Sequence, residues 1–258
     1  MKKTRLLAGD IGGTKVNLAL CEIEGDQIVP QSMRRYSSSE FKSLSEILLI
    51  YFSESSVDLS TISAACFGVP GPVRQGRCQT INLPWILDEK ELERTLNFTP
   101  IRLINDLFAM AYGISTVRLK NEIVPLHRGQ ELSATNANQA LIAPGTGLGE
   151  ALLFWDGERH LVSASEGGHC DFGPQNEEQI ELLKWLWPRH PHVSWEHVAS
   201  GPGIFRIYRF LRETGREVEP AEMSAALSSP EVDPSPVIAN AALEGKSKIC
   251  IRTMDQIR

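Results

Sequence analysis

The sequence lacks the features of a secreted, membrane-spanning or nucleic-acid-binding protein. No apolar run is long enough to span a bilayer, and the run near the start is broken at Gly9 and Asp10, too early for a signal peptide. The net charge of -6 argues against a nucleic-acid backbone or an anionic membrane as the main partner. We therefore expect a cytoplasmic protein with no nucleic-acid partner and no membrane partner.

Cysteine usage excludes two further classes. The five cysteines are odd in number, scattered and without any Cys-x-x-Cys pair, so we expect neither a disulfide framework nor a structural zinc site. The chain also lacks internal repeats and low-complexity tracts. With 258 residues, 42% hydrophobic and 22% charged, it has an ordinary globular composition and room for one large domain or two modest ones.

The first informative stretch covers residues 6–20, where two apolar runs of strand length flank Gly12 and Gly13. Glycine pairs suit the positive-φ corners of short hairpin turns, and they let backbone N–H groups approach an anion closely. Thr14 adds a hydroxyl donor, and Asp10 stands where a carboxylate could hold a hydrated divalent cation. A hairpin that binds no ligand would explain the same glycines equally well.

Strands and helices alternate through the first half of the chain. The hydrophobic pattern predicts strands at 27–35, 61–69 and 101–104, and helices at 41–52 and 88–96, the latter capped by Asp88. This order predicts an α/β domain with a mixed sheet faced by helices. Ligands in such sheets gather at the carboxyl ends of strands, where Asp10, residues 70–71 and residues 105–106 fall.

Two short segments of this half admit two interpretations each. Asp106 either caps the helix that it opens or accepts the proton of an alcohol, while Asn105 holds a neighbouring hydroxyl. In residues 82–85, Asn82 could bind a sugar hydroxyl beside Trp85, or the segment could be a capped turn that buries the indole.

Residues 138–155 repeat the pattern of the first hairpin. Expected strands at 138–143 and 150–155 flank the glycine-rich residues 144–149. No helix follows these glycines directly, as the dinucleotide fingerprint requires, and no Gly-Lys-Ser/Thr sequence ends the run as in a P-loop. We therefore predict a second phosphate-binding hairpin, so that two lobes could hold a nucleotide's phosphates from opposite sides.

Polar groups then gather in residues 165–173, after an expected strand at 159–163. Glu166 and His169 flank a Gly-Gly turn and suit a pair of sugar-hydroxyl ligands, whereas a metal site lacks a second cluster to complete it. A loop with a self-satisfied histidine is the alternative. Further on, the pattern predicts helices at 176–187 and 204–211 and a loop over 228–236, and Glu196 by itself resembles a surface carboxylate.

Taken together, these motifs resemble the bacterial glucokinase family of the hexokinase and actin-like ATPase superfamily. The matching segments, in family order, are residues 9–14, 70–73, 104–106, 145–149, 166–169 and 196–203. The resemblance implies a two-lobed, actin-like (ribonuclease H-like) α/β fold with a mixed sheet flanked by helices in each lobe. The small lobe would be residues 1–113 and the larger lobe residues 114–258.

The resemblance also implies a reaction, namely transfer of the γ-phosphoryl group of ATP to the 6-hydroxyl of glucose, the first step of glycolysis. Asp106 would be the catalytic base. The implied glucose ligands, to which we add Asn82 from its own sequence context, are Asn105, Glu166, His169 and Glu196. The ATP phosphates would lie against Gly12, Gly13, Thr14, Gly145, Thr146 and Gly147, with Asp10 near the Mg²⁺ ion, directly or through water.

Several positions depart from the family pattern. Ser165 replaces a glycine, and Cys170 stands alone where the repressor-kinase branch carries a cysteine-rich zinc motif. The family continues well past a position like Leu243 with a long apolar helix, whereas residues 245–258 resemble a polar tail. We therefore expect an incomplete second lobe, weak ATP binding and low activity. The alternative function is a catalytically weak sugar-binding remnant or regulator, and a homodimer is left open.

Overall fold

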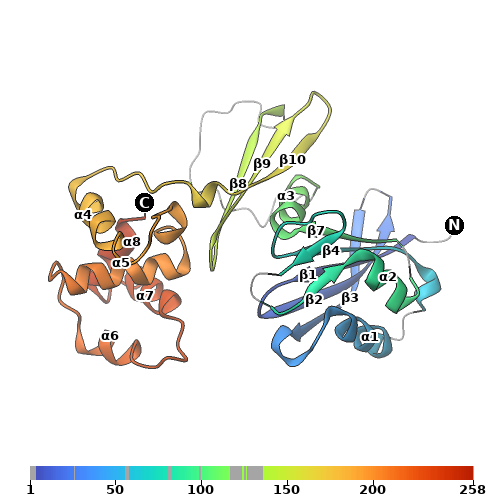
Figure 1. The fold of residues 1–258 in the computed structure, drawn as a ribbon, viewed down its shortest axis with the longest axis horizontal. Coiled ribbons are helices and arrows are strands. Elements are labelled where there is room, and N and C mark those ends of the chain that lie inside the picture. The colour runs from blue at the N-terminus through green and yellow to red at the C-terminus, as the bar shows by residue number, and fades with distance from the viewer. Residues whose placement is uncertain are drawn as a thin grey trace. The chain divides into compact units, whose positions relative to one another are not determined.

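The computed structural model describes residues 4–25, 27–55, 58–80, 83–98, 100–116, 124, 126 and 136–257. The chain divides into two compact units, residues 1–135 and 136–258, each with a hydrophobic core of its own (Figure 1). None of the helices in the described ranges is long and apolar enough to cross a membrane.

The first unit is built on a five-stranded mixed sheet with the order β3-β2-β1-β4-β7. Its strands are β1 (Thr4–Ile11), β2 (Lys15–Glu24), β3 (Gln27–Ser37), β4 (Ile62–Val69) and β7 (Ile101–Asn105). The consecutive strands β1, β2 and β3 pair antiparallel, whereas β4 lies parallel to both β1 and β7. The mixed sheet predicted from the sequence is confirmed, and a small pair, β5 (Arg77–Gln79) and β6 (Ile86–Asp88), accompanies it.

Helices cover both faces of this sheet. On one face, α1 (Leu44–Ser55) and α2 (Glu89–Leu96) supply buried side chains to the core, and Asp88 caps α2 as predicted, accepting from the N–H of Glu91. On the other face lies α3 (Asp106–Thr116). Gly68 leaves room for α3, because a Cβ there would sit 3.4 Å from the Cβ of Ala109.

Trp85 settles one of the open interpretations. Its side chain is buried in the core of the first unit with an exposed fraction of 3%, and its carbonyl oxygen accepts a hydrogen bond from the hydroxyl of Thr80. The turn that buries the indole is therefore the interpretation that holds for Trp85. Asn82, the sugar ligand suggested beside it, lies outside the described residues.

The sheet of the second unit differs from the prediction. Its strands β8 (Gln139–Pro144), β9 (Leu148–Trp155) and β10 (His160–Ser165) run in the order β10-β9-β8 and pair only antiparallel, so this sheet is not mixed among the described residues. Short turns join these consecutive strands, and a parallel pair would need a crossover of a dozen or more residues, on the order of a whole helix.

Helices make the second core. They are α4 (Glu177–Leu186), α5 (Gly201–Glu213), α6 (Ala221–Ala226), α7 (Pro234–Leu243) and α8 (Lys248–Asp255), with single 3₁₀ turns η4 (Gly167–His169) and η5 (Trp195–His197). Buried residues from α4, α5, α7 and α8 pack in one cluster. The predicted helices at 176–187 and 204–211 correspond to α4 and α5, which are capped by Asn176 and Ser200.

Residues 228–236 are not a loop throughout. The loop ends at Asp233, whose side chain accepts from the N–H of Ser235 and caps α7. Pro234 and Pro236 lie in the first turn of this helix, where a missing N–H costs no intrahelical hydrogen bond. The proline-rich composition therefore marked a helix start rather than a break.

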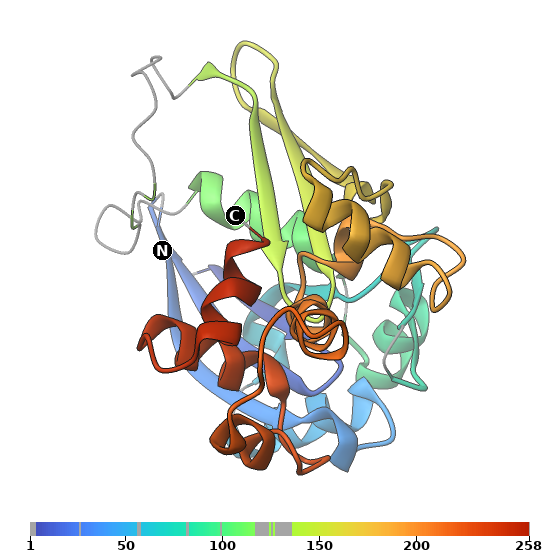
Figure 2. The same ribbon diagram turned by 90° about the vertical axis from the view of Figure 1, so that its left-hand side faces the viewer.

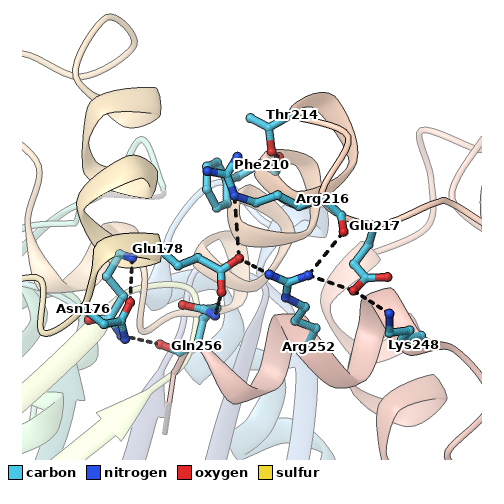
Figure 3. A network of polar contacts seen from close by, with 10 residues as sticks. Asn176, Glu178, Phe210, Thr214, Arg216, Glu217, Lys248, Arg252 and Gln256 are labelled. Atoms are coloured by element: carbon cyan, nitrogen blue, oxygen red, sulfur yellow. Dashed lines mark hydrogen bonds and ion pairs between the residues drawn. The ribbon is translucent and has the colours of Figure 1, made fainter.

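The predicted polar tail at 245–258 is wrong, because this segment contains the amphipathic helix α8. Ile249 and Cys250 are buried in the second core, and Thr253 is also buried. Figure 3 shows the polar side, where Arg252 donates to the carboxylate of Glu217 at 2.8 Å and Glu178 accepts from Gln256 at 2.7 Å. The charges that suggested a tail are thus paired with residues of α4 and of the segment after α5. Sequence alone does not reveal these partners.

Candidate active site

The first glycine turn joins β1 to β2, as the sequence predicts. The N–H of Gly12 donates to the carbonyl oxygen of Lys15 at 2.8 Å, and a Cβ on Gly12 would lie 2.9 Å from that same oxygen. Neither Gly12 nor Gly13 is among the glycines with positive φ. The expected positive-φ corner is therefore wrong, and Gly12 is required for close backbone approach instead.

Ser38 stabilises this turn through two hydrogen bonds. Its hydroxyl donates to the carbonyl oxygen of Gly12 at 2.8 Å, and its N–H donates to the carbonyl oxygen of Thr14 at 3.0 Å. The Ser38 side chain is buried, while Thr14 is exposed at the turn. Our sequence reasoning missed Ser38, because only the pairing of β2 with β3 brings it to the turn.

Asp10 stands at the carboxyl end of β1 and is exposed. Its Oδ2 accepts a hydrogen bond from Asn17 at 3.1 Å, and Asn17 in turn accepts one from Arg35 at 2.8 Å. No group of three or more His, Cys, Asp or Glu side chains within the described ranges is arranged to hold a metal ion. A single carboxylate nevertheless fits Mg²⁺, which is commonly held by about one or two carboxylates together with water and phosphate oxygens.

Asn105 caps helix α3, and Oδ1 of Asp106 also accepts from the N–H of Leu107, at 2.9 Å. The Oδ1 of Asn105 accepts from the N–H groups of Leu107 and Phe108, both at 3.1 Å. Its Nδ2 donates to Oδ1 of Asp106 at 3.0 Å and to the carbonyl oxygen of Gly71 at 3.3 Å. Asn105 therefore orients Asp106 while fixing the start of the helix.

Asp106 has the electrostatic setting of a base. Burial raises the pKa of this half-buried carboxyl, and the nearby charge of Asp10 raises it further, against hydrogen bonds from Leu107 and Asn105 that lower it. A raised pKa makes a carboxylate a stronger proton acceptor near neutral pH. Asp106 is thus oriented by neighbours and poised to take a proton from an alcohol.

The second glycine turn, residues 145–147, joins β8 to β9 and is closed by a hydrogen bond of 2.8 Å from the N–H of Gly145 to the carbonyl oxygen of Gly147. Gly145 and Thr146 are exposed. The N–H of Gly201 donates to the carbonyl oxygen of Gly145 at 2.8 Å, so the turn meets the start of α5 (Figure 2). The second glycine hairpin predicted from the sequence is therefore present, and phosphate binding by it stays a prediction.

Glu166 and His169 lie on the turn that follows β10, and both are exposed. Their Oε2 and Nε2 atoms are 3.7 Å apart. A Cβ on Gly167 would lie 2.0 Å from Oε2 of Glu150, and one on Gly168 would lie 2.1 Å from the carbonyl oxygen of Leu148. Gly168 is therefore needed for close packing of this turn against the backbone of β9, whereas a Cβ at Gly167 would displace only the end of the Glu150 side chain.

A cavity of about 1200 Å³ lies within the second unit, beside the second glycine turn. Gly145 and Thr146 line it at the turn, together with Ser235 of α7 and Met254 of α8. Its lining therefore combines the glycine turn with an apolar wall from the helices.

The structure thus assembles the predicted residues in two sets. The first unit brings together Asp10, the turn at residues 12–14 and the pair Asn105-Asp106. The second brings together Glu196, the turn at residues 145–147 and the turn carrying Glu166 and His169. Ser38 joins the first set.

The structure contains a mixed sheet with a glycine turn at its first hairpin. It also contains an oriented carboxylate at a strand-to-helix junction and a second glycine hairpin. These features are typical of sugar kinases with the actin-like fold. Comparison with known proteins identifies the family. The family model for glucokinase matches residues 7–257. A glucokinase of Trichormus variabilis is 36% identical over 263 residues, covering 97% of this chain and 76% of that protein. The chain belongs to the glucokinase family.

A second relative and two solved structures agree with this assignment. The glucokinase of Synechocystis is 33% identical over 269 residues, covering 96% of this chain and 75% of that protein. The crystal structure of a glucokinase from an Antarctic psychrotroph matches with a TM-score of 0.74 and 30% identity, over 98% of this chain and 74% of that one.

The glucokinase of Balamuthia mandrillaris, solved in complex with glucose, matches with a TM-score of 0.72 over 99% of this chain and 73% of that one. At 22% identity this match supports the fold alone.

Proposed function

We propose that this chain transfers the γ-phosphoryl group of ATP to the 6-hydroxyl of glucose. The main support is the state of Asp106: Asn105 orients its carboxylate, and burial raises its pKa. Phosphoryl transfer depends mainly on positioning and charge stabilisation, with a base beside the acceptor hydroxyl. The family assignment supplies the sugar and the nucleotide.

Each predicted residue of the site has a place in this reaction. Asp106 would accept the proton of the 6-hydroxyl as the oxygen attacks the γ-phosphorus. Asn105 would hold Asp106 and, with Glu166, His169, Glu196 and Asn82, the remaining hydroxyls. Asn105 uses Oδ1 for two backbone N–H groups and its two Nδ2 hydrogens for Asp106 and Gly71, so a contact with the sugar would replace one of these hydrogen bonds.

The two glycine turns would receive the phosphates of ATP. Gly12, Gly13 and Thr14 form the turn of the first unit, and residues 145–147 form the turn of the second. Asp10 would hold a Mg²⁺ ion, directly or through water; when bound, the ion neutralises phosphate charge. The cavity beside the second turn would receive the adenosine.

The test is a coupled assay with glucose and Mg-ATP, with Asp106→Ala as the inactive control. We expect turnover in the wild type and a loss of about 10²–10⁴-fold in the variant. If the wild type showed no turnover but bound glucose in calorimetry, the result would instead support the alternative of a sugar-binding protein. The relatives that we report are named as glucokinases and do not favour that alternative.

We also propose that the two lobes are residues 1–113 and 114–258 and that the protein is cytoplasmic. We propose further that it is a monomer or a homodimer. Light scattering on the purified chain measures the last of these directly.

A further inference from the structure

The second glycine turn is tied at both ends to one short segment, residues 196–201. At one end, the carbonyl oxygen of Gly145 accepts from the N–H of Gly201 at 2.8 Å. At the other, the N–H of Leu148 donates to Oε2 of Glu196 at 3.0 Å. The partner at this second end is a carboxylate, and hydrogen bonds to an ionised acceptor are roughly twice as strong as neutral ones.

Gly147 shows how closely Glu196 approaches the turn. A Cβ at Gly147 would lie 2.5 Å from Oε2 of Glu196, so any other residue would push the carboxylate away. Oε2 is the oxygen that accepts from Leu148. The glycine therefore leaves the space that the carboxylate needs to reach the turn.

Glu196 is itself held on a fixed frame. Ser200 donates its hydroxyl to the carbonyl oxygen of Glu196 at 2.6 Å and caps α5 by accepting from the N–H of Gly203 at 3.1 Å. Ser194 and His197 form a capping box around η5, the turn that carries Glu196. Ser194 and Ser200 are buried. These hydrogen bonds fix the backbone that carries Glu196, so the carboxylate can fix the position of the glycine turn.

We propose that Glu196 is a positioning residue for the second phosphate turn, which it holds through the N–H of Leu148. This inference rests on the proposed function, and it adds a task to a residue assigned only to glucose by family resemblance. The carboxylate shapes nucleotide binding even when no sugar is present. Its charge would by itself oppose a phosphate, but Arg206 lies within its electrostatic range: burial lowers the pKa of the Arg206 guanidinium, and the charge of Glu196 acts against that lowering.

Two variants of Glu196 separate the possible tasks. Glu196→Gln keeps an oxygen that can accept from Leu148 and removes the charge, whereas Glu196→Ala removes the acceptor altogether. If Glu196 holds the turn, Glu196→Ala weakens nucleotide binding and Glu196→Gln retains it. If Glu196 serves glucose alone, neither variant changes nucleotide binding. If it acts only by repulsion, both variants strengthen it.

The measurement is calorimetry of the full chain with Mg²⁺ and a non-hydrolysable ATP analogue, without glucose. We expect the Kd of Glu196→Ala to rise about 5–20-fold and that of Glu196→Gln to stay within about threefold of the wild type. Hydrogen exchange should be faster at the Leu148 amide in Glu196→Ala. Glu166→Gln is the matched control: it should weaken glucose binding and leave nucleotide binding without sugar at the wild-type value.

The outcomes distinguish this inference from the proposed function. Unchanged nucleotide affinity and Leu148 exchange in Glu196→Ala, in a wild type that phosphorylates glucose, would overturn the inference alone. A wild type that binds nucleotide in a Glu196-dependent way but phosphorylates no glucose would overturn the proposed function and leave the inference standing. A wild type that binds no nucleotide would overturn both.

Discussion

At the scale of single residues, Asp106 shows how the fold favours chemistry over stability. Burial and the charge of Asp10 both raise the pKa of its carboxyl. A carboxyl whose pKa is higher in the folded than in the unfolded state stabilises the fold only while it is protonated, at acidic pH. That stability is lost as pH rises through the raised pKa, so at neutral pH the charged group is a cost.

Replacing Asp106 by Asn should therefore separate activity from stability. We expect kcat to fall about 10²–10⁴-fold, because the base is lost, with much smaller change in glucose affinity. The melting temperature at pH 7 should stay the same or rise, because Asn removes the disfavoured charge. The measurements are the coupled assay and a thermal melt. In the wild type, kcat should fall as pH drops through the raised pKa of Asp106.

Near-normal turnover of Asp106→Asn would contradict this role and leave the residue a support for the start of α3. A purely structural role of Asp106 can be tested by stability. Asn105 accepts from two N–H groups of the helix start in any case, so a support from Asp106 would show as a further contribution to stability. Loss of a cap costs about 0.5–2 kcal/mol of stability. A marked drop in melting temperature with preserved kcat would therefore assign Asp106 to structure.

At the scale of elements, α8 depends on both of its faces. Its apolar side is buried in the second core, and its polar side pairs across to Glu178 and Glu217 through Arg252 (Figure 3). Arg252 lowers the pKa of Glu217, so the stability from this pair is present above the ordinary pKa of glutamate. It is lost as pH falls through the lowered value.

Arg252→Ala should therefore lower the melting temperature of the second unit at neutral pH by about 2–6 °C. Lys246→Ala is the matched control, because Lys246 pairs with Glu244 at an exposed site and should shift melting very little. The difference in melting temperature between the two variants should become smaller at pH values below the ordinary pKa of glutamate. Equal melting of both variants at pH 7 would show that the α8 network contributes no net stability.

At the scale of the whole molecule, the two units have separate cores. Leu48 of α1 is completely buried among residues of the first unit, and Leu182 of α4 is almost completely buried among residues of the second. None of the residues that the structure describes belongs to both clusters. Cavity-forming substitutions should therefore act mainly within their own unit.

Leu48→Ala and Leu182→Ala form a matched pair, each expected to cost about 2–5 kcal/mol locally. Hydrogen exchange in Leu182→Ala should accelerate in α4, α5, α7 and α8 and stay near the wild-type rate in β1, β4 and β7. Leu48→Ala should show the reverse. Acceleration spread equally over both units in both variants would mean that the chain unfolds as one cooperative body.

The sequence by itself determined the elements whose signals are local. Apolar periodicity predicted β4, β7 and α1, and side chains next to helix starts predicted the caps Asp88 and Asn176. The order of the glycine hairpins and the Asn105-Asp106 pair identified the family. Local hydrogen bonds and hydrophobic spacing act between near neighbours, so they are readable along the chain.

Only the tertiary structure decided what lies behind the site. Ser38 reaches Gly12 across 26 residues, Glu196 reaches Leu148 across 48, and Arg252 reaches Glu178 across 74. Such partners are chosen by the packing of whole elements, and a lone serine or carboxylate in the sequence carries no mark of its partner. The turns could therefore be predicted from the sequence, but the residues that hold them in place could not.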